Sequence, residues 1–227
     1  MSFDHEQKPG DWVIYNNNQL LAANKPAGIP VQSDKTGDKS LLNLLEIFAK
    51  HPLHLIHRLD RPASGVVLFA KNKKALAHLN AQFRERKVEK TYLAVVPKKD
   101  IAPQAVLTHY LTKNGRLNRA FASETPLPNA KEARLSYRIA GTIDHYHLLE
   151  IDLTSGRHHQ IRAQLAALGL PIKGDVKYGA RRGNRDRSIH LHAYRLAFRH
   201  PVSGEREVIT APLPDEAVWR AFDLKMD

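Results

Sequence analysis

The residue with the clearest chemical potential is Asp60, an aspartate placed between two arginines. Arg58 and Arg61 flank it, and an apolar run of strand length at residues 53–57 precedes it. Most loop aspartates cap a turn or pair with a neighbouring arginine. A carboxylate held among cations can instead act as a nucleophile or an acid–base group. The residues around Asp60 allow both interpretations.

A second pattern with chemical potential is the pair His190 and His192. Their spacing puts both imidazoles on one face of a strand, as a metal site can require. No third ligand is evident in the sequence. We therefore expect a structural use for the pair and no metal site.

The elements that must position these groups follow from the spacing of apolar residues. Helices are predicted at residues 40–48, with Ser40 as the N-cap, at 72–86, at 160–168 and at 215–222. Strands are predicted at residues 12–15, 20–23, 53–57, 66–70, 91–96, 134–139, 147–153, 189–198 and 207–210. The polar segment 112–131, which contains two prolines, is expected to be a surface excursion. Strands and helices without strict alternation favour an α+β fold with a mixed, mainly antiparallel sheet and flanking helices.

Composition restricts the function classes further. The 227 residues carry 35 Lys+Arg against 23 Asp+Glu, a formal charge of +12, which favours a polyanionic partner, although basic proteins also bind acidic membranes and acidic proteins. The chain has no cysteine, which excludes disulfides, thiolate nucleophiles and cysteine-based metal sites. Neither a secretory signal nor a membrane-spanning run is evident, so we expect a cytoplasmic protein with no membrane partner.

Four ordered motifs together resemble the RluA-type pseudouridine synthase family. The stretch at residues 57–66, His-Arg-Leu-Asp-Arg-Pro-Ala-Ser-Gly-Val, resembles the family's aspartate motif. Residues 24–28 resemble its N-terminal motif and residues 90–94 its tyrosine motif. The arginine motif is matched at residues 155–162 and onward through 169–175 to Tyr178-Gly179, with a closing match at 191–201. The resemblance covers about residues 20 to 210, nearly the whole chain.

Three positions depart from the family's usual pattern. Ala63 and Ser155 replace common threonines, and His158 stands where a threonine is typical. None of these changes removes a catalytic group. Ala63 does lack a hydroxyl that could brace the Asp60 loop.

The resemblance implies an isomerase that converts uridines in structured rRNA or tRNA to pseudouridine, after flipping the base out of its stack. Asp60 is then the catalytic carboxylate, and attack on C1′, attack on C6 and a glycal route all stay open. Tyr92 would stack on the base and help to remove the C5 proton, although a core tyrosine is the alternative. Arg162 would orient and neutralise the carboxylate, unless it is an ordinary helix-surface arginine. The net reaction needs no nucleotide or other cofactor.

RNA contacts are expected from cations and polar groups near the motifs. Arg58 could fill the gap left by the flipped base, and His57 could shape the loop. Lys25 could contact phosphate or be a surface lysine. Two basic stretches, residues 71–100 with a local charge of +6 and 177–188 with +4, are either phosphate contacts or solvated faces. The full set of expected RNA-binding residues is Arg58, His57, Lys25, Lys90, Arg157, His159, Gln160, Arg84, Arg181 and Arg182.

The predicted organisation is a single catalytic domain over residues 1–227, with a short N-terminal extension at 1–11. About a dozen residues precede the first predicted strand, so no S4-like RNA-binding module is expected. We expect a monomer. A protein that binds RNA or assists ribosome assembly without catalysis is the competing hypothesis. A phosphoryl-transfer enzyme would want clustered carboxylates for metal ions, and the sequence shows none.

Overall fold

The computed structural model describes residues 8–34 and 36–223, which fall into two compact units. Unit 1 comprises Met1–Val88 and Ala193–Leu213, and unit 2 comprises Glu89–His192 and Pro214–Asp227, as far as these are described. Most of the predicted extension 1–11 lies outside the described residues. The prediction of a single catalytic domain stays a prediction.

Unit 1 is built on a sheet whose core strands are β2 (Leu20–Lys25) and β4 (Ser64–Ala70), paired antiparallel. On either side lie β1 (Val13–Asn16), which pairs with β2, and β10 (Leu191–Arg199), which neighbours β4 and enters the unit at Ala193. The short β3 (His54–Leu55) also pairs with β4, and β11 (Arg206–Thr210) pairs with β10. Every pairing in this unit whose register is determined is antiparallel.

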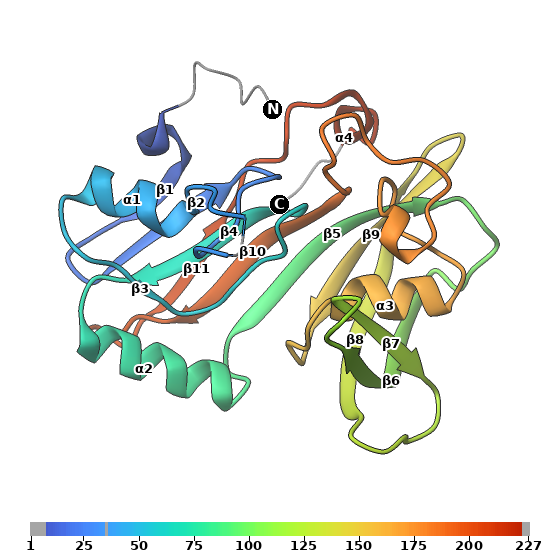
Figure 1. Ribbon diagram of the computed structural model, residues 1–227, viewed down its shortest axis with the longest axis horizontal. Helices are drawn as coiled ribbons and strands as arrows, with labels where there is room; N and C mark the ends of the chain where they lie inside the picture. Colours follow the sequence, from blue (N-terminus) through green and yellow to red (C-terminus); the bar gives the residue numbers. More distant parts are fainter. Residues whose placement is uncertain (1–7, 35, 224–227) are drawn as a thin grey trace. The chain divides into compact units, whose positions relative to one another are not determined.

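Two helices, α1 (Leu41–Ala49) and α2 (Lys73–Arg84), cover opposite faces of this sheet (Figure 1). Successive side chains of a strand point to opposite faces. Leu21 of β2 accordingly belongs to a cluster with Leu45 of α1, whereas Leu20 belongs to a cluster with Leu79 of α2. Both faces of β2 and β4 are therefore buried, which explains their unbroken apolar sequence.

Both helices begin at the predicted N-terminal signals. The Ser40 side chain accepts a hydrogen bond from the backbone N–H of Asn43, and the Asn72 side chain accepts one from Ala75. These bonds satisfy backbone donors that the first helical turn leaves unpaired. A 3-10 helix, η1 (Pro9–Trp12), precedes β1.

Unit 2 contains an antiparallel sheet with the strand order β5-β9-β8-β6-β7. The strands are β5 (Glu89–Pro97), β6 (Gln104–Asn114), β7 (Arg119–Ser123), β8 (Lys131–Thr142) and β9 (Tyr146–Leu153). Helix α3 (Gln160–Ala167) packs Ala163 against residues of β6, β7 and β8 (Figure 1). The 3-10 helix η2 (Val176–Tyr178) and the short α4 (Ala217–Arg220) complete the unit.

The segment 112–131, predicted as a surface excursion, contains regular structure in its first half. Strand β6 continues to Asn114, and β7 pairs with it as a hairpin. The side chain of Asn114 accepts the N–H of Leu117 and so shapes the turn. On β6, Leu107, His109 and Leu111 are buried in an alternation that precedes the polar segment. Residues 124–130 have no regular structure, as expected.

The α+β fold class with a mainly antiparallel sheet is confirmed. None of the helices within residues 8–34 and 36–223 is long and apolar enough to cross a bilayer.

Candidate active site

The loop that carries Asp60 connects β3 to β4 in unit 1, and its exit is tightly constrained. The N–H of Ala63 donates to the carbonyl of Asp60 at 3.1 Å, which closes a turn. Gly65 has a φ of +115°, and a Cβ there would lie 2.3 Å from the carbonyl oxygen of Ala193 on β10. Only glycine permits so close an approach of two backbones. Because the turn is closed by the backbone, it does not depend on the hydroxyl that Ala63 lacks.

Lys25 anchors the same loop from inside the unit. It is fully buried, and its ammonium donates to the carbonyls of Pro26 at 2.9 Å, Ile29 at 3.0 Å and Arg61 at 3.1 Å. These three acceptors match the three donors of an ammonium group. The expected phosphate contact of Lys25 is therefore wrong, and so is the surface-lysine alternative. Lys25 instead ties the turn at residues 26–29 to the residue after Asp60.

The electrostatic setting of Lys25 follows from its burial. Burial lowers the pKa of Lys25 from 10.5 to about 7, while the nearby Asp60 carboxylate opposes the change and Arg61 reinforces it. The largest of these effects is burial, so the Lys25 side chain loses its proton more readily than an exposed lysine does.

Arg61 also has a structural role in the loop. Its Nε donates to the carbonyl of Gly28 at 2.8 Å, and its Nη atoms reach Thr36 and Asp38. The backbone N–H of Gly28 donates back to the carbonyl of Arg61 at 2.8 Å. The turn that contains Gly28 and the Asp60 loop are therefore joined by hydrogen bonds in both directions.

His57 and Arg58 have different surroundings in this loop, since His57 is held by protein contacts and Arg58 is exposed. The Nε2 atom of His57 accepts the N–H of Leu68 at 3.0 Å, and its ring stacks on Phe83. His57 therefore shapes the loop, as the sequence indicated, and its Nε2 atom is not available to RNA. Arg58 is exposed, and its contact with RNA stays a prediction.

Tyr92 and Arg162 belong to unit 2. Tyr92 lies on β5 opposite Ile151 of β9 and is half-buried between the buried residues Thr91 and Leu93. The stacking role of Tyr92 and the core alternative both stay predictions.

Arg162 is buried on α3 in a double hydrogen bond to Asp175. Its Nε donates to Oδ2 at 2.7 Å and its Nη2 donates to Oδ1 at 2.8 Å, with 5% and 1% of the two side chains exposed. The guanidinium also lies over the ring of Tyr178, 4.9 Å from its centroid. The alternative of a helix-surface arginine is wrong. Asp175 and Tyr178 were part of the matched motif, but the sequence assigned neither of them this supporting role.

Tyr178 connects Arg162 to the rest of the unit. Its hydroxyl accepts the N–H of Ala120 on β7 at 2.8 Å and hydrogen-bonds Nδ1 of His159 at 3.0 Å. The His159 ring is buried and meets the Tyr178 ring edge-on. His159 thus has a packing role in this cluster, and its expected contact with RNA is untested.

Gln160 does not fit its expected role in RNA binding. It is 3% exposed, and its amide oxygen accepts from the hydroxyl of Ser155 at 2.9 Å and the N–H of Arg157 at 3.0 Å. Its amide nitrogen donates to the carbonyl of Arg134 on β8 at 3.2 Å. Gln160 therefore fastens the turn at 155–159 to the sheet and has no amide group directed at a ligand. Ser155 supplies the hydroxyl that this arrangement needs.

The other expected RNA contacts are cations with at least part of their surface accessible. Arg84, Arg181 and Arg182 are exposed, and Lys90 and Arg157 are partly so. Within unit 2, the Nε of Arg157 donates to the carbonyl of Glu132. Exposure is compatible with phosphate contact but does not test it.

His190 and His192 have structural partners. Asn184 donates to Nδ1 of His190 at 3.0 Å, so the proton on Nε2 points to Glu216 at 2.9 Å. Burial lowers the pKa of His190, and Trp219 contacts both imidazole rings. These contacts fit the structural use expected for the pair, which stays a prediction.

Comparisons with known proteins agree with the motifs. A family model described as RNA pseudouridylate synthase matches residues 19–167. The ribosomal large subunit pseudouridine synthase C of Vibrio vulnificus is 34% identical over 215 residues, covering 91% of this chain and 67% of the relative. The tRNA pseudouridine synthase C of Haemophilus ducreyi is 32% identical over 222 residues, covering 90% and 91%. The chain spans about two thirds of the length of the ribosomal relatives.

Solved structures show the same fold. The structure titled Human RNA Pseudouridylate Synthase Domain Containing 1 superimposes with a TM-score of 0.76 at 25% identity, covering 89% of this chain and 83% of that chain. The structure titled Human RNA Pseudouridylate Synthase Domain Containing 4 gives a TM-score of 0.74 at 24% identity, covering 91% and 90%.

Proposed function

Because the chain belongs to the RNA pseudouridylate synthase family, we propose that it isomerises specific uridines of structured rRNA or tRNA to pseudouridine, with Asp60 as the essential carboxylate. The proposal rests mainly on the way in which the loop that carries Asp60 is held in place. Lys25, Gly28 and Gly65 hold its loop by backbone contacts that leave little freedom. Such rigidity is what a reactive group needs, since small displacements cost large factors in rate.

The reaction exchanges one glycosidic bond for another. The bond from C1′ to N1 of uracil breaks, the base rotates, and a bond from C1′ to C5 forms. The proton on C5 leaves and N1 gains one, so atoms and charge balance without a redox partner. The uridine must first leave its stack, which costs a few kcal/mol and favours loops or distorted helices as substrates.

Asp60 must be ionised to act as nucleophile or base, although a carboxylate in a closed site resists ionisation. In the proposal Arg162 supplies the cation that orients and neutralises the carboxylate, as the resemblance to the family implies. Its guanidinium is already held by Asp175 and Tyr178, so little conformational entropy is lost when it acts.

Tyr92 is proposed to stack on the flipped uracil and to help to remove the C5 proton. The phenol ring suits both tasks, because it offers an aromatic face and a group that can accept or relay a proton. Arg58 is proposed to enter the gap that the base leaves. The exposed cations Arg84, Arg181 and Arg182 are proposed to contact phosphates, which predicts a marked salt dependence of RNA binding.

The test uses RNA tritiated at C5 of uridine, because formation of pseudouridine releases that tritium to water. We expect release from rRNA or tRNA that lacks the modification, assayed as separate substrates. Asp60→Asn should abolish release while RNA affinity stays within about twofold. Asp144→Asn, at an exposed turn of unit 2, removes the same charge and should leave both unchanged.

The competing hypothesis makes the opposite prediction. A protein that binds RNA without catalysis would bind both RNAs and release tritium from neither. Arg162→Lys refines the assignment, because lysine cannot reproduce the planar fork. Near-normal release by that variant would remove Arg162 from the reaction.

A further inference from the structure

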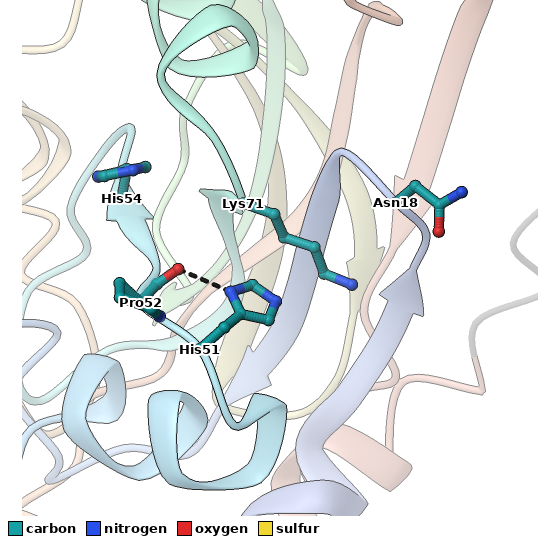
Figure 2. Close-up of a pocket in the computed structure, with 5 residues that line it drawn as sticks. All are labelled: Asn18, His51, Pro52, His54 and Lys71. Carbon is teal, nitrogen blue, oxygen red and sulfur yellow. Dashed lines mark hydrogen bonds between the residues drawn. The ribbon is translucent and has the colours of Figure 1, made fainter.

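A hollow in unit 1 lies at the end of β4 opposite to the Asp60 loop. Its volume is about 450 Å³, and it is lined by Asn18, His51, Pro52, His54 and Lys71 (Figure 2). The lining comes from three connections that the fold brings together, namely the β1–β2 turn, the segment from α1 into β3, and the residue that follows β4. None of these residues has a role in the proposed reaction.

The charged groups of this hollow are basic, and its lining contains no carboxylate. Burial lowers the pKa of Lys71, with no compensating negative charge among the causes. Lys71 forms no ion pair with any residue in 8–34 or 36–223. An ammonium that is partly removed from water without a counter-charge is an unfavourable arrangement in isolation, and an anion would relieve it.

The other polar groups are suited to oxygen atoms of an anion. Nδ1 of His51 donates to the carbonyl of Pro52 at 2.8 Å, so the other nitrogen of that ring is the one left for a ligand. In Figure 2 the Lys71 side chain extends into the space between His51 and Asn18, and His54 lies at the other end. The Lys71 ammonium and the Asn18 side-chain amide can each donate to a phosphate oxygen, and the remaining nitrogen of His51 can do so only when both nitrogens of that ring carry protons.

The helix that begins two residues after Lys71 adds further positive charge. Lys73 and Lys74 occupy the first turn of α2 and are exposed, and that turn contains no acidic residue. Cations at this end of a helix are unfavourable because they oppose its dipole. A polyanion that reaches this turn would compensate them.

We propose that the hollow binds a backbone phosphate of the substrate RNA, which makes it a docking site separate from the Asp60 loop. The inference rests on the proposed function, because it takes the substrate to be a structured RNA. Strand β4 has seven residues and spans roughly 23 Å, a distance that a stem of several base pairs covers. One stem can therefore reach the hollow and the Asp60 loop together. The contact sets the register of the RNA without reading its sequence.

The test compares Lys71→Gln with Lys39→Gln, which removes the same charge from an exposed site of unit 1 outside the hollow. RNA binding is measured from low to high salt. Loss of one phosphate contact should reduce the slope of log K against log salt by about 0.7–0.9 and weaken binding about fivefold at 0.15 M salt. Lys39→Gln should change affinity less than twofold. Equal effects of the two substitutions, or no effect of either, would overturn the proposal.

Two further variants and readouts separate this result from other causes. Lys71→Arg keeps the charge and should retain the wild-type slope, whereas a slope as low as that of Lys71→Gln would indicate a packing role and refute the phosphate contact. Tritium release by Lys71→Gln at saturating RNA should equal that of the wild type. An absence of release from the wild type would refute the proposed function, while the salt slopes would still test the docking site.

A lone phosphate ion is distinguished by the imidazole NMR signals of His51 and His54. Added RNA should shift both signals in the wild type and neither in Lys71→Gln. Inorganic phosphate at millimolar concentration is the second arm. Shifts with phosphate but none with RNA would assign the hollow to a free anion and overturn the RNA contact.

Discussion

Replacing Asp175 by asparagine removes one charge from a deeply buried ion pair. Asparagine has the size of aspartate, so the cavity and the packing stay the same. Its amide keeps one acceptor oxygen but turns an NH₂ group toward the second guanidinium donor. Arg162 then remains charged and buried with one of its two hydrogen bonds to this partner lost.

The expected cost follows from the burial of the pair. Removing one partner of a buried ion pair costs about 3–5 kcal/mol. Domains of this size lose about 2–4 °C in Tm for each kcal/mol. We therefore expect Asp175→Asn to lower Tm by about 6–20 °C and to reduce the free energy of unfolding accordingly.

A matched control lies in the same unit. Arg138 and Glu150 form the same double contact, from Nε at 3.2 Å and from Nη2 at 2.6 Å, but 58% of the arginine side chain is exposed. An exposed pair contributes about 0–1 kcal/mol, so Glu150→Gln should change Tm by about 4 °C at most. Thermal and urea unfolding of both variants measure the difference. If the two substitutions cost the same, burial is not what gives the Arg162 pair its importance.

Two further predictions concern the Asp60 loop. Gly65→Ala should destabilise the protein by about 2–5 kcal/mol, since positive φ costs about 1–2 kcal/mol and overpacking against Ala193 about 1–3 more. Gly28 also has a positive φ, but a Cβ there would meet open space, so Gly28→Ala should cost less stability. If urea unfolding shows the same loss of unfolding free energy for both variants, the close-approach argument is contradicted. The pKa of Lys25 is about 7 in the folded state and 10.5 in the unfolded state. Between these pH values the unfolded state therefore binds more protons than the folded state does. Lys25 should therefore make the unfolding free energy rise with pH in that window, by up to about 1.4 kcal/mol per pH unit. The Lys25→Met variant should show a flatter rise. Identical pH profiles of the variant and the wild type would refute this.

The positions of most elements could be predicted from local sequence alone. Ser40 and Asn72 start helices because a short polar side chain before an apolar stripe satisfies the first backbone donors. The apolar runs of β2 and β4 indicated strands because residues buried on both faces leave no polar interruption. The hairpin β6–β7 was missed because one of its faces is polar and its buried face is short.

The four motifs, which need no knowledge of contacts, were enough to indicate the family, and the family model and the relatives confirm it. Motifs name residue types in order along the chain. They do not reveal which of those residues end in solvent and which end in the interior. The catalytic roles of Asp60, Tyr92 and Arg162 accordingly stay proposals that kinetics must test.

What only the tertiary structure decided is the partner of each polar side chain in the motifs. Lys25 and Gln160 resembled ligand-binding groups in the sequence, but folding surrounds them with backbone partners. Asp175 had no assigned role until folding placed it against Arg162. The physical reason is that hydrophobic periodicity is a local property, whereas the pairing of a buried polar group depends on segments far apart in the chain. The sequence determined which groups could carry chemistry, and the fold determined which of them support the others.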